Sequence, residues 1–220
     1  MVKTKTGILV IVSVVGVLLS IIIMSTPACS ATFKGQLIDA DSREPIEGAV
    51  VVLSWHEERP TPPSGGGTRL KDVKETLTDK DGKWSIDGPK GRKLGNFLSI
   101  VSFLTRMYIT KPPQFIIFKP GYCSWPKGLF VESCKEKIKY ELDPQGHYKL
   151  GEGETIELPK LTNREERKKN SSISLPDDKN MKKKLINLIK LLSEEDAYLY
   201  PGLQEKSMYK ELLREFNYEK

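Results

Sequence analysis

The sequence predicts a mainly β domain, preceded by an apolar N-terminal segment and followed by a helical tail. Residues 31–161 hold short runs rich in β-branched and aromatic residues, separated by Gly, Pro and Asp, which is typical of strands joined by turns. Residues 185–220 carry apolar side chains at helical spacing instead. We therefore expect four segments, namely 1–29 as a signal peptide or membrane anchor, 31–161 as the β domain, 162–184 as a charged linker and 185–220 as the helical tail.

The composition limits what the chain can do. Its 220 residues leave room for one ordinary domain and a tail once an export segment is set aside. The net charge of +6 comes from 35 basic and 29 acidic residues, and both signs are interspersed along the chain. Such a pattern indicates a solvated surface, so no nucleic-acid partner is expected.

The N-terminus has the three parts of an export signal. Lys3 and Lys5 precede residues 7–24, which carry no charge, and small residues surround Cys29. This order places the rest of the chain outside the cytoplasm, in a bacterial cell envelope.

Three kinds of processing fit this signal. We expect a lipoprotein, in which Cys29 is acylated and Ala28 precedes it, although Thr26 and Pro27 depart from the usual residues. The alternatives are ordinary cleavage near Ala28 or Ala31, or no cleavage, because about 18 apolar residues can just span a bilayer as an anchor. We therefore expect the protein to bind a membrane, either through the lipid on Cys29 or through an N-terminal helix.

The three cysteines agree with export. If Cys29 is lipidated or removed, Cys123 and Cys134 remain as a pair in an oxidising compartment, where disulfides persist. We predict a Cys123–Cys134 bridge, which would contribute about 2–3 kcal/mol. The alternative is two unpaired cysteines, one of them in a core. The sequence lacks the paired Cys and His ligands of a zinc site, so we expect no metal.

The expected strands follow from alternation and from turn residues. Asp81 and Gly82 form the predicted hairpin turn, after which Trp84 and Ile86 point inward. Residues 56–68, dense in Pro and Gly, predict a surface loop, and the apolar residues 97–109 predict a short helix or a hydrophobic loop. The predicted strands are 31–38, 49–55, 73–78, 83–86, 115–118, 137–142 and 155–158.

The tail allows two interpretations. Leu185, Leu188, Ile189 and Leu192 share one helical face, which suits a helical hairpin packed on the β domain. In the alternative, the first helix lies on a membrane surface and uses its basic residues there. Those residues are Lys182, Lys183, Lys184 and Lys190.

Three ordered motifs resemble a known family. They are residues 35–39 running into 44–52, residues 78–84 and residues 118–122. Together they resemble the carboxypeptidase regulatory-like domain. The resemblance covers residues 33–161 and implies a transthyretin-like (prealbumin-like) Greek-key β-sandwich of about seven strands.

The shared motifs are structural rather than chemical. Gly82 and Gly121 supply positive φ angles in turns, while Thr78 and Asp79 can bond the hairpin backbone. No motif residue is placed to do chemistry.

Catalysis and cofactors are not expected. His56 and His147 are the two histidines, both beside predicted turns, so a nucleophile would lack a base. Hydroxyisourate hydrolases share the architecture that the resemblance implies, but this sequence lacks their His/Arg cluster and C-terminal motif. Asp79 does not begin a calcium loop, because Lys90 stands where a late acidic ligand would be needed. No small-molecule substrate is expected.

Two functions remain. The first is a structural or protein-binding module of the cell envelope, in which residues 97–109 or the tail helices meet a protein partner. The alternative is a carbohydrate-binding module that uses exposed aromatic rings. Its candidate rings are Trp55, Tyr122, Trp125 and Tyr148.

Overall fold

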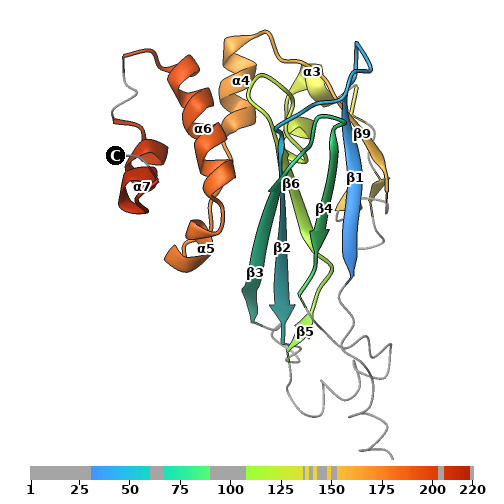
Figure 1. Ribbon diagram of the computed structural model, residues 1–220, viewed down its shortest axis with the longest axis vertical. Helices are drawn as coiled ribbons and strands as arrows, with labels where there is room; N and C mark the ends of the chain where they lie inside the picture. Colours follow the sequence, from blue (N-terminus) through green and yellow to red (C-terminus); the bar gives the residue numbers. More distant parts are fainter. Residues whose placement is uncertain are drawn as a thin grey trace, which may run out of the picture.

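The prediction of a mainly β protein is confirmed. The computed structural model describes residues 31–59, 67–89, 108–135, 137–138, 141–142, 148–149, 153–202 and 206–218. Two β-sheets face each other, and helices cover one of them from the outside (Figure 1). The predictions for residues 1–29, including Cys29, for His147 and for most of residues 97–109 lie outside the described residues.

The elements have the following bounds. The strands are β1 (Thr32–Asp39), β2 (Val50–Glu58), β3 (Thr68–Leu77), β4 (Lys83–Asp87), β5 (Ile109–Thr110), β6 (Gln114–Phe118), β7 (Glu141–Leu142), β8 (Tyr148–Lys149) and β9 (Thr155–Leu158). The helices are the 3-10 helix η1 (Lys127–Phe130), α3 (Glu132–Lys135), α4 (Arg164–Ser171), α5 (Lys179–Lys183), α6 (Ile186–Leu199) and α7 (Met208–Glu215).

Each main sheet is built around one long strand. In the first sheet β1 pairs with β4 antiparallel and with β9 parallel. In the second sheet β2 pairs antiparallel with β3 on one side and with β6 and β5 on the other. β7 and β8 form a separate antiparallel pair.

The inner faces of the two sheets share one core. Alternate residues point inward, so Leu37 and Ile156 of the first sheet meet Val51 and Leu53 of the second. Trp84 lies in the same core, as its place in the hairpin predicted. This core holds together the described residues between 31 and 161, which are called the β unit below.

The outer face of the second sheet forms a second core with the helices. Val50 and Phe118 of the sheet pack with Leu188 and Leu192 of α6. The α6 helix in turn pairs with α7 through Ile189 and Leu213. The apolar face of α6 is therefore buried in the protein, as the helical-hairpin interpretation predicted.

The prediction of a linker at residues 162–184 is wrong, because this segment contains α4 and α5. Asn163 caps α4 by accepting from the Glu165 and Glu166 amides, and Asp178 caps α5. None of the helices in the described ranges has the length and apolar character needed to cross a membrane.

Several strand boundaries also differ from the predictions. β2 extends to Glu58 rather than ending at residue 55, so residues 56–58 of the predicted surface loop belong to a strand. β3 begins at Thr68 rather than at residue 73, because the second half of β2 continues to pair with it after a register shift at Trp55. Of the strand predicted at residues 137–142, Glu141 and Leu142 form β7, whereas Lys137 and Ile138 follow the short α3 helix outside any strand.

The predicted turn glycines have the backbone angles that they were expected to have. Gly82 has φ 71° and Gly121 has φ 78°. A Cβ at Gly82 would also lie 2.2 Å from the carbonyl oxygen of Leu37, so the hairpin can approach β1 only without a side chain there.

Candidate functional site

A group of polar side chains, most of them buried or half-buried, gathers around the turn at residues 120–122, where the β unit meets α4 and α6. We call this group the turn junction. Its members are Asp39, Tyr122, Ser124, Lys160, Arg167, Asn170 and Glu195. It brings together side chains that are far apart in the sequence.

Asp39, at the end of β1, accepts hydrogen bonds from four directions. The backbone amides of Asp41 and Ser42 donate to Oδ1 at 2.9 Å each. The Tyr122 hydroxyl donates to Oδ2 at 3.1 Å, and the Lys160 ammonium lies 2.8 Å from the same oxygen. Both carboxylate oxygens are therefore occupied.

These contacts control the ionisation of Asp39. Burial alone would raise the pKa of its carboxyl group, but the bonds from Lys160, from the two amides and from Tyr122 hold it well below its ordinary value. The hydrogen bond to Asp39 in turn raises the pKa of Lys160. Burial, followed by that same carboxylate, raises the pKa of Tyr122. None of the three is poised to exchange a proton near neutral pH.

A second charged contact ties α4 to α6. Arg167 donates from Nε to Glu195 Oε1 at 2.7 Å and from Nη2 to Oε2 at 2.5 Å. The Gly121 amide donates to the same carboxylate at 3.2 Å, so the turn itself joins this pair. The Tyr198 ring covers the guanidinium at 3.8 Å. The hydrogen bonds that Arg167 donates to Glu195 are the main cause that raises the pKa of Arg167.

Asn170 joins α4 to the chain after the turn. Its Nδ2 donates to the Tyr122 carbonyl at 2.8 Å, and its Oδ1 accepts from the Ser124 amide at 2.6 Å. The Asn170 side chain is buried. The turn junction thus fixes the helical tail to the β unit through paired groups, and its geometry supplies attachment rather than a free acid, base or nucleophile.

The predicted disulfide is present. The Cys123 and Cys134 sulfurs are bonded, and both residues are fully buried in the core of the β unit. The bridge connects the strand-like segment after the turn to α3.

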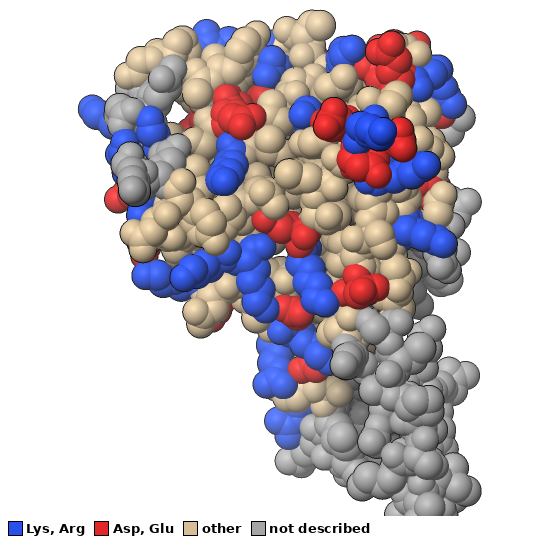
Figure 2. Space-filling model, viewed as in Figure 1, with Lys and Arg blue, Asp and Glu red and all other residues tan. Residues whose placement is uncertain are grey.

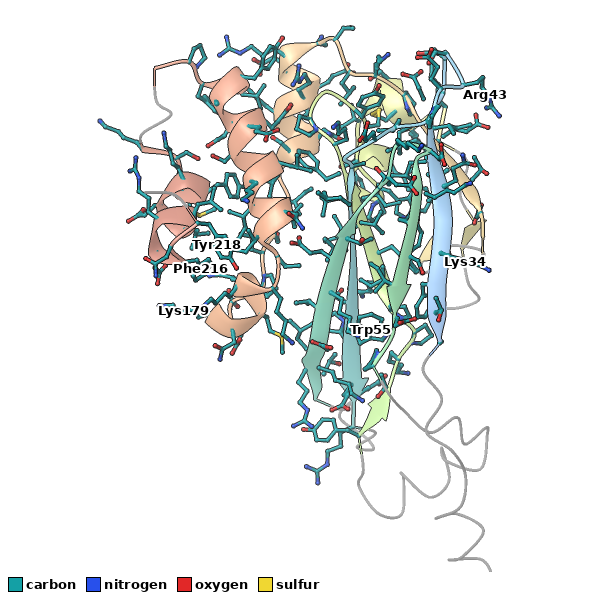
Figure 3. The ribbon with its side chains drawn as sticks, in the orientation of Figure 1. Lys34, Arg43, Trp55, Lys179, Phe216 and Tyr218 are labelled. Atoms are coloured by element: carbon teal, nitrogen blue, oxygen red, sulfur yellow. A yellow bond between two sulfur atoms is a disulfide. The ribbon has the colours of Figure 1, made fainter. Side chains whose placement is uncertain are left out.

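Two of the four aromatic residues proposed for a ligand are in the core. Trp55 is 3% exposed and Trp125 is 2% exposed, so the prediction that their rings face a ligand is wrong. Figure 3 shows Trp55 among the side chains between the two sheets. Tyr122 is half-buried with its hydroxyl on Asp39, and the Tyr148 side chain lies outside the described residues.

The sequence did not indicate the partners within the turn junction. Arg167, Asn170 and Glu195 come from segments interpreted as linker or as amphipathic helix, and their pairing spans the molecule. One signal was available, because Asn163 followed by Glu165 and Glu166 is a helix-start pattern.

An open groove of about 550 Å³ lies elsewhere, beside β1 and β4. Lys34 and Lys83 line it, and the Trp84 Nε1 behind it is buried without a hydrogen-bond partner. Asp79, also at the groove, is already bound to the Asp81 and Lys83 amides. Within the described ranges no three His, Cys, Asp or Glu side chains gather as a metal site would require.

Comparisons with known proteins do not indicate a function for this chain. No protein-family profile matches the chain, and no curated protein does. Among solved structures, a 9R-lipoxygenase from Cyanothece is similar over 84% of this chain and 28% of that chain, with 11% identity and a TM-score of 0.26. A likeness at that level carries no argument about fold or activity.

Proposed function

We propose that this protein is a non-catalytic module of the bacterial cell envelope, tethered to a membrane by its N-terminus and built to hold or bind another envelope protein. Its β unit would be a carboxypeptidase regulatory-like domain, with the transthyretin-like Greek-key arrangement of about seven strands.

The Cys123–Cys134 disulfide is the observation that carries this proposal. Both cysteines are fully buried, and they are joined within the core of the β unit. Disulfides of this structural kind persist in oxidising compartments and are rare in the cytosol. The bridge therefore supports export, which is what the charged and apolar pattern of residues 1–29 predicts.

The positions of the family-like motifs support the finer fold assignment. Gly82 ends a tight turn between β3 and β4, and Thr78 beside it accepts from the Ala49 amide and donates to the Ile46 carbonyl. The motif that begins β2 is thus bound to the hairpin motif, and Tyr122 of the third motif reaches Asp39 of the first. The three motifs form one connected scaffold.

The state of the polar groups supports a role without catalysis. Within the turn junction each carboxylate has a cationic partner, Asp39 with Lys160 and Glu195 with Arg167. Carboxylates that are paired with cations inside the protein stabilise the structure, whereas a catalytic base needs a proton-accepting atom that faces a substrate.

Carbohydrate binding has less support. Two of its four candidate rings, Trp55 and Trp125, are buried, and a sugar-stacking surface needs exposed rings on one face. Protein binding thus remains the proposed role.

Thiol trapping in growing cells tests the proposal. Free thiols are alkylated at quenching, the protein is then reduced and alkylated with a second reagent, and Cys123 and Cys134 are read by peptide mass spectrometry. The proposal predicts the second label on both residues. The Cys123→Ser variant is the control, because Cys134 should then take the first label. First-label reaction of both cysteines in the wild type would contradict export.

The type of tether is decided by intact mass. Membrane-fraction protein is compared with its Cys29→Ser variant. A mass gain of diacylglycerol size that disappears in the variant identifies the lipoprotein. A full-length mass identifies the uncleaved anchor, and a shortened, unmodified chain identifies ordinary cleavage.

A further inference from the structure

The chain enters the β unit at one defined end, which we call the tether end. It comprises the first residues of β1, the last residues of β2 and the first residues of β3, with β5 beside them. The Ala31 carbonyl accepts from the Gly88 amide at 2.8 Å, and the Phe33 ring lies 6.1 Å from that of Trp55, which fixes the start of β1 beside the second half of β2. Figure 1 shows these strand ends together at the lower end of the molecule.

The length of the connection keeps this end close to a membrane. If residues 7–24 span the bilayer, the chain from residue 24 to Ala31 reaches at most about 25 Å. If Cys29 is acylated, the two residues to Ala31 reach only about 7 Å. In both cases the tether end, and not the opposite end with Arg43, is held near the lipid headgroups (Figure 3).

The side chains at the tether end suit a headgroup layer. The Arg69 guanidinium lies 4.1 Å above the ring of Tyr108, and both residues are exposed. Tyrosine and snorkelling arginine are typical of the zone between water and lipid tails. Lys111 is also exposed, with half of its side chain in solvent.

Helix α5 adds positive charge on the side of β3, a few residues along the strand from the tether end. Lys184, which follows α5, pairs with Asp72, and Asp72 lies opposite Trp55 in the β2–β3 register. Lys182 and Lys183 have no carboxylate at ion-pair distance among the described residues. Figure 2 shows Lys and Arg side chains running from this helix toward the free end of β3.

Three of the acidic groups at this end are paired with cations, while Asp87, beside the start of β1, accepts a hydrogen bond from the Thr32 hydroxyl. Glu57 lies between Arg69 and Lys71, Glu58 pairs with Lys111, and Asp72 pairs with Lys184. They therefore neutralise neighbours within the protein and leave the charges of Lys182 and Lys183 for an outside partner.

We infer that the tether end and α5 dock on the anionic phospholipid headgroups of the membrane that holds the chain's own N-terminus. This inference rests on the tether in the proposed function and adds an orientation to it. The opposite end, with the β3–β4 turn around Lys80, then faces away from the bilayer. Each lysine near an anionic surface shifts the balance between docked and undocked orientations about fivefold.

Lysine footprinting of the full-length protein tests the inference. The protein is placed in nanodiscs of phosphatidylcholine alone or of phosphatidylcholine with phosphatidylglycerol, treated with an acylating reagent and read by peptide mass spectrometry. With phosphatidylglycerol we expect the reactivity of Lys111, Lys182 and Lys183 to fall several-fold, and that of Lys80 to stay unchanged. High salt should reverse the protection, because it screens the attraction.

A pair of charge-reversal variants controls for folding. Lys182→Glu with Lys183→Glu should abolish the lipid-dependent protection of Lys111, whereas Lys80→Glu with Lys83→Glu should leave it intact. Equal reactivity in both lipids, or equal protection of Lys80, would overturn the inference while the tether stands. If the chain does not enter nanodiscs at all, the tether itself is contradicted, and the inference fails with it.

Discussion

The Arg167 guanidinium donates two hydrogen bonds to the Glu195 carboxylate, and both side chains are almost entirely buried where α4 meets α6. The pair is shared with the β unit, because the Gly121 amide donates to the same carboxylate. One charged contact therefore joins two helices and a turn, and it makes the helical tail part of the folded body.

Removal of one member of this ion pair should lower the stability of the folded protein. Arg167→Ala leaves the Glu195 carboxylate buried without its cation, and we expect a loss of about 3–5 kcal/mol in the free energy of unfolding. Urea denaturation followed by tryptophan fluorescence measures it. The matched control, Arg167→Met with Glu195→Leu, should recover most of the loss because no charge stays buried. A double variant as unstable as the single one would contradict this account.

Asp39 should make stability depend on acid. Its pKa lies well below the ordinary value in the folded protein, whereas the unfolded chain titrates near 4. Its contribution is thus fully present above about pH 4 and is lost as the pH falls from there through the folded pKa.

The Asp39→Asn variant isolates that contribution. At pH 7 we expect a loss of about 2–3 kcal/mol in the free energy of unfolding, and at pH 3 a smaller difference from the wild type. Unfolding in urea at both pH values measures the two differences. A difference that stays constant between pH 7 and pH 3 would show that the charge of Asp39 does not matter.

Glu75 of β3 should act as the N-terminal cap of α6. Its Oε1 accepts from the Asn187 amide at 2.6 Å and its Oε2 from the Leu188 amide at 3.0 Å, while Leu185 at the cap position makes no side-chain bond. Glu75→Ala should cost about 1–2 kcal/mol and speed hydrogen exchange of those two amides. Glu75→Gln keeps one acceptor oxygen, so its stability should lie between that of the wild type and that of Glu75→Ala. Unchanged exchange in Glu75→Ala would rule out the capping role.

The pH effect of Glu75 has the opposite sign to that of Asp39. Burial raises the pKa of its carboxyl group despite the two amide bonds. Its contribution to stability is therefore largest below the unfolded pKa and declines as the pH rises through the folded pKa. The Glu75→Gln variant should lack this decline when unfolding is measured between pH 4 and pH 7.

The Cys123–Cys134 bridge should contribute to stability by restricting the unfolded chain. The bridge spans a sequence separation of 11, which corresponds to about 3 kcal/mol. Cys123→Ser with Cys134→Ser should lower the free energy of unfolding by that amount, and Cys29→Ser should not lower it. An equal loss in Cys29→Ser would mean that the effect does not come from the bridge.

Local patterns predicted the turns and several of the strands of the β unit. Turns could be predicted at Asp81–Gly82 and at Pro120–Gly121 because the backbone angles of a turn depend on the residues in it. The alternation of apolar and polar residues around Trp84 predicted that its side chain faces the core. The β-branched run at residues 49–55 predicted a strand, and β2 pairs with neighbours on both sides.

Features that depend on contacts across the molecule could not be predicted. Trp55 and Trp125 are aromatic residues near predicted loops, and only the packing of the second sheet shows that both are buried. α4 was missed because it has few apolar residues. It is held by Asn170 and Arg167, whose partners Ser124 and Glu195 lie 46 and 28 residues away.

The measurement that most directly tests the central claim is protease accessibility in spheroplasts of a bacterium that expresses the full-length protein. If the chain is tethered with its folded part outside the cytoplasm, added protease should cleave the exposed sites around α5 and α7 while a cytoplasmic marker stays intact. The cleaved protein should remain in the membrane fraction through its N-terminal piece. Complete protection of the chain until detergent is added would contradict the claim, because the β unit and its helices would then lie inside the cell.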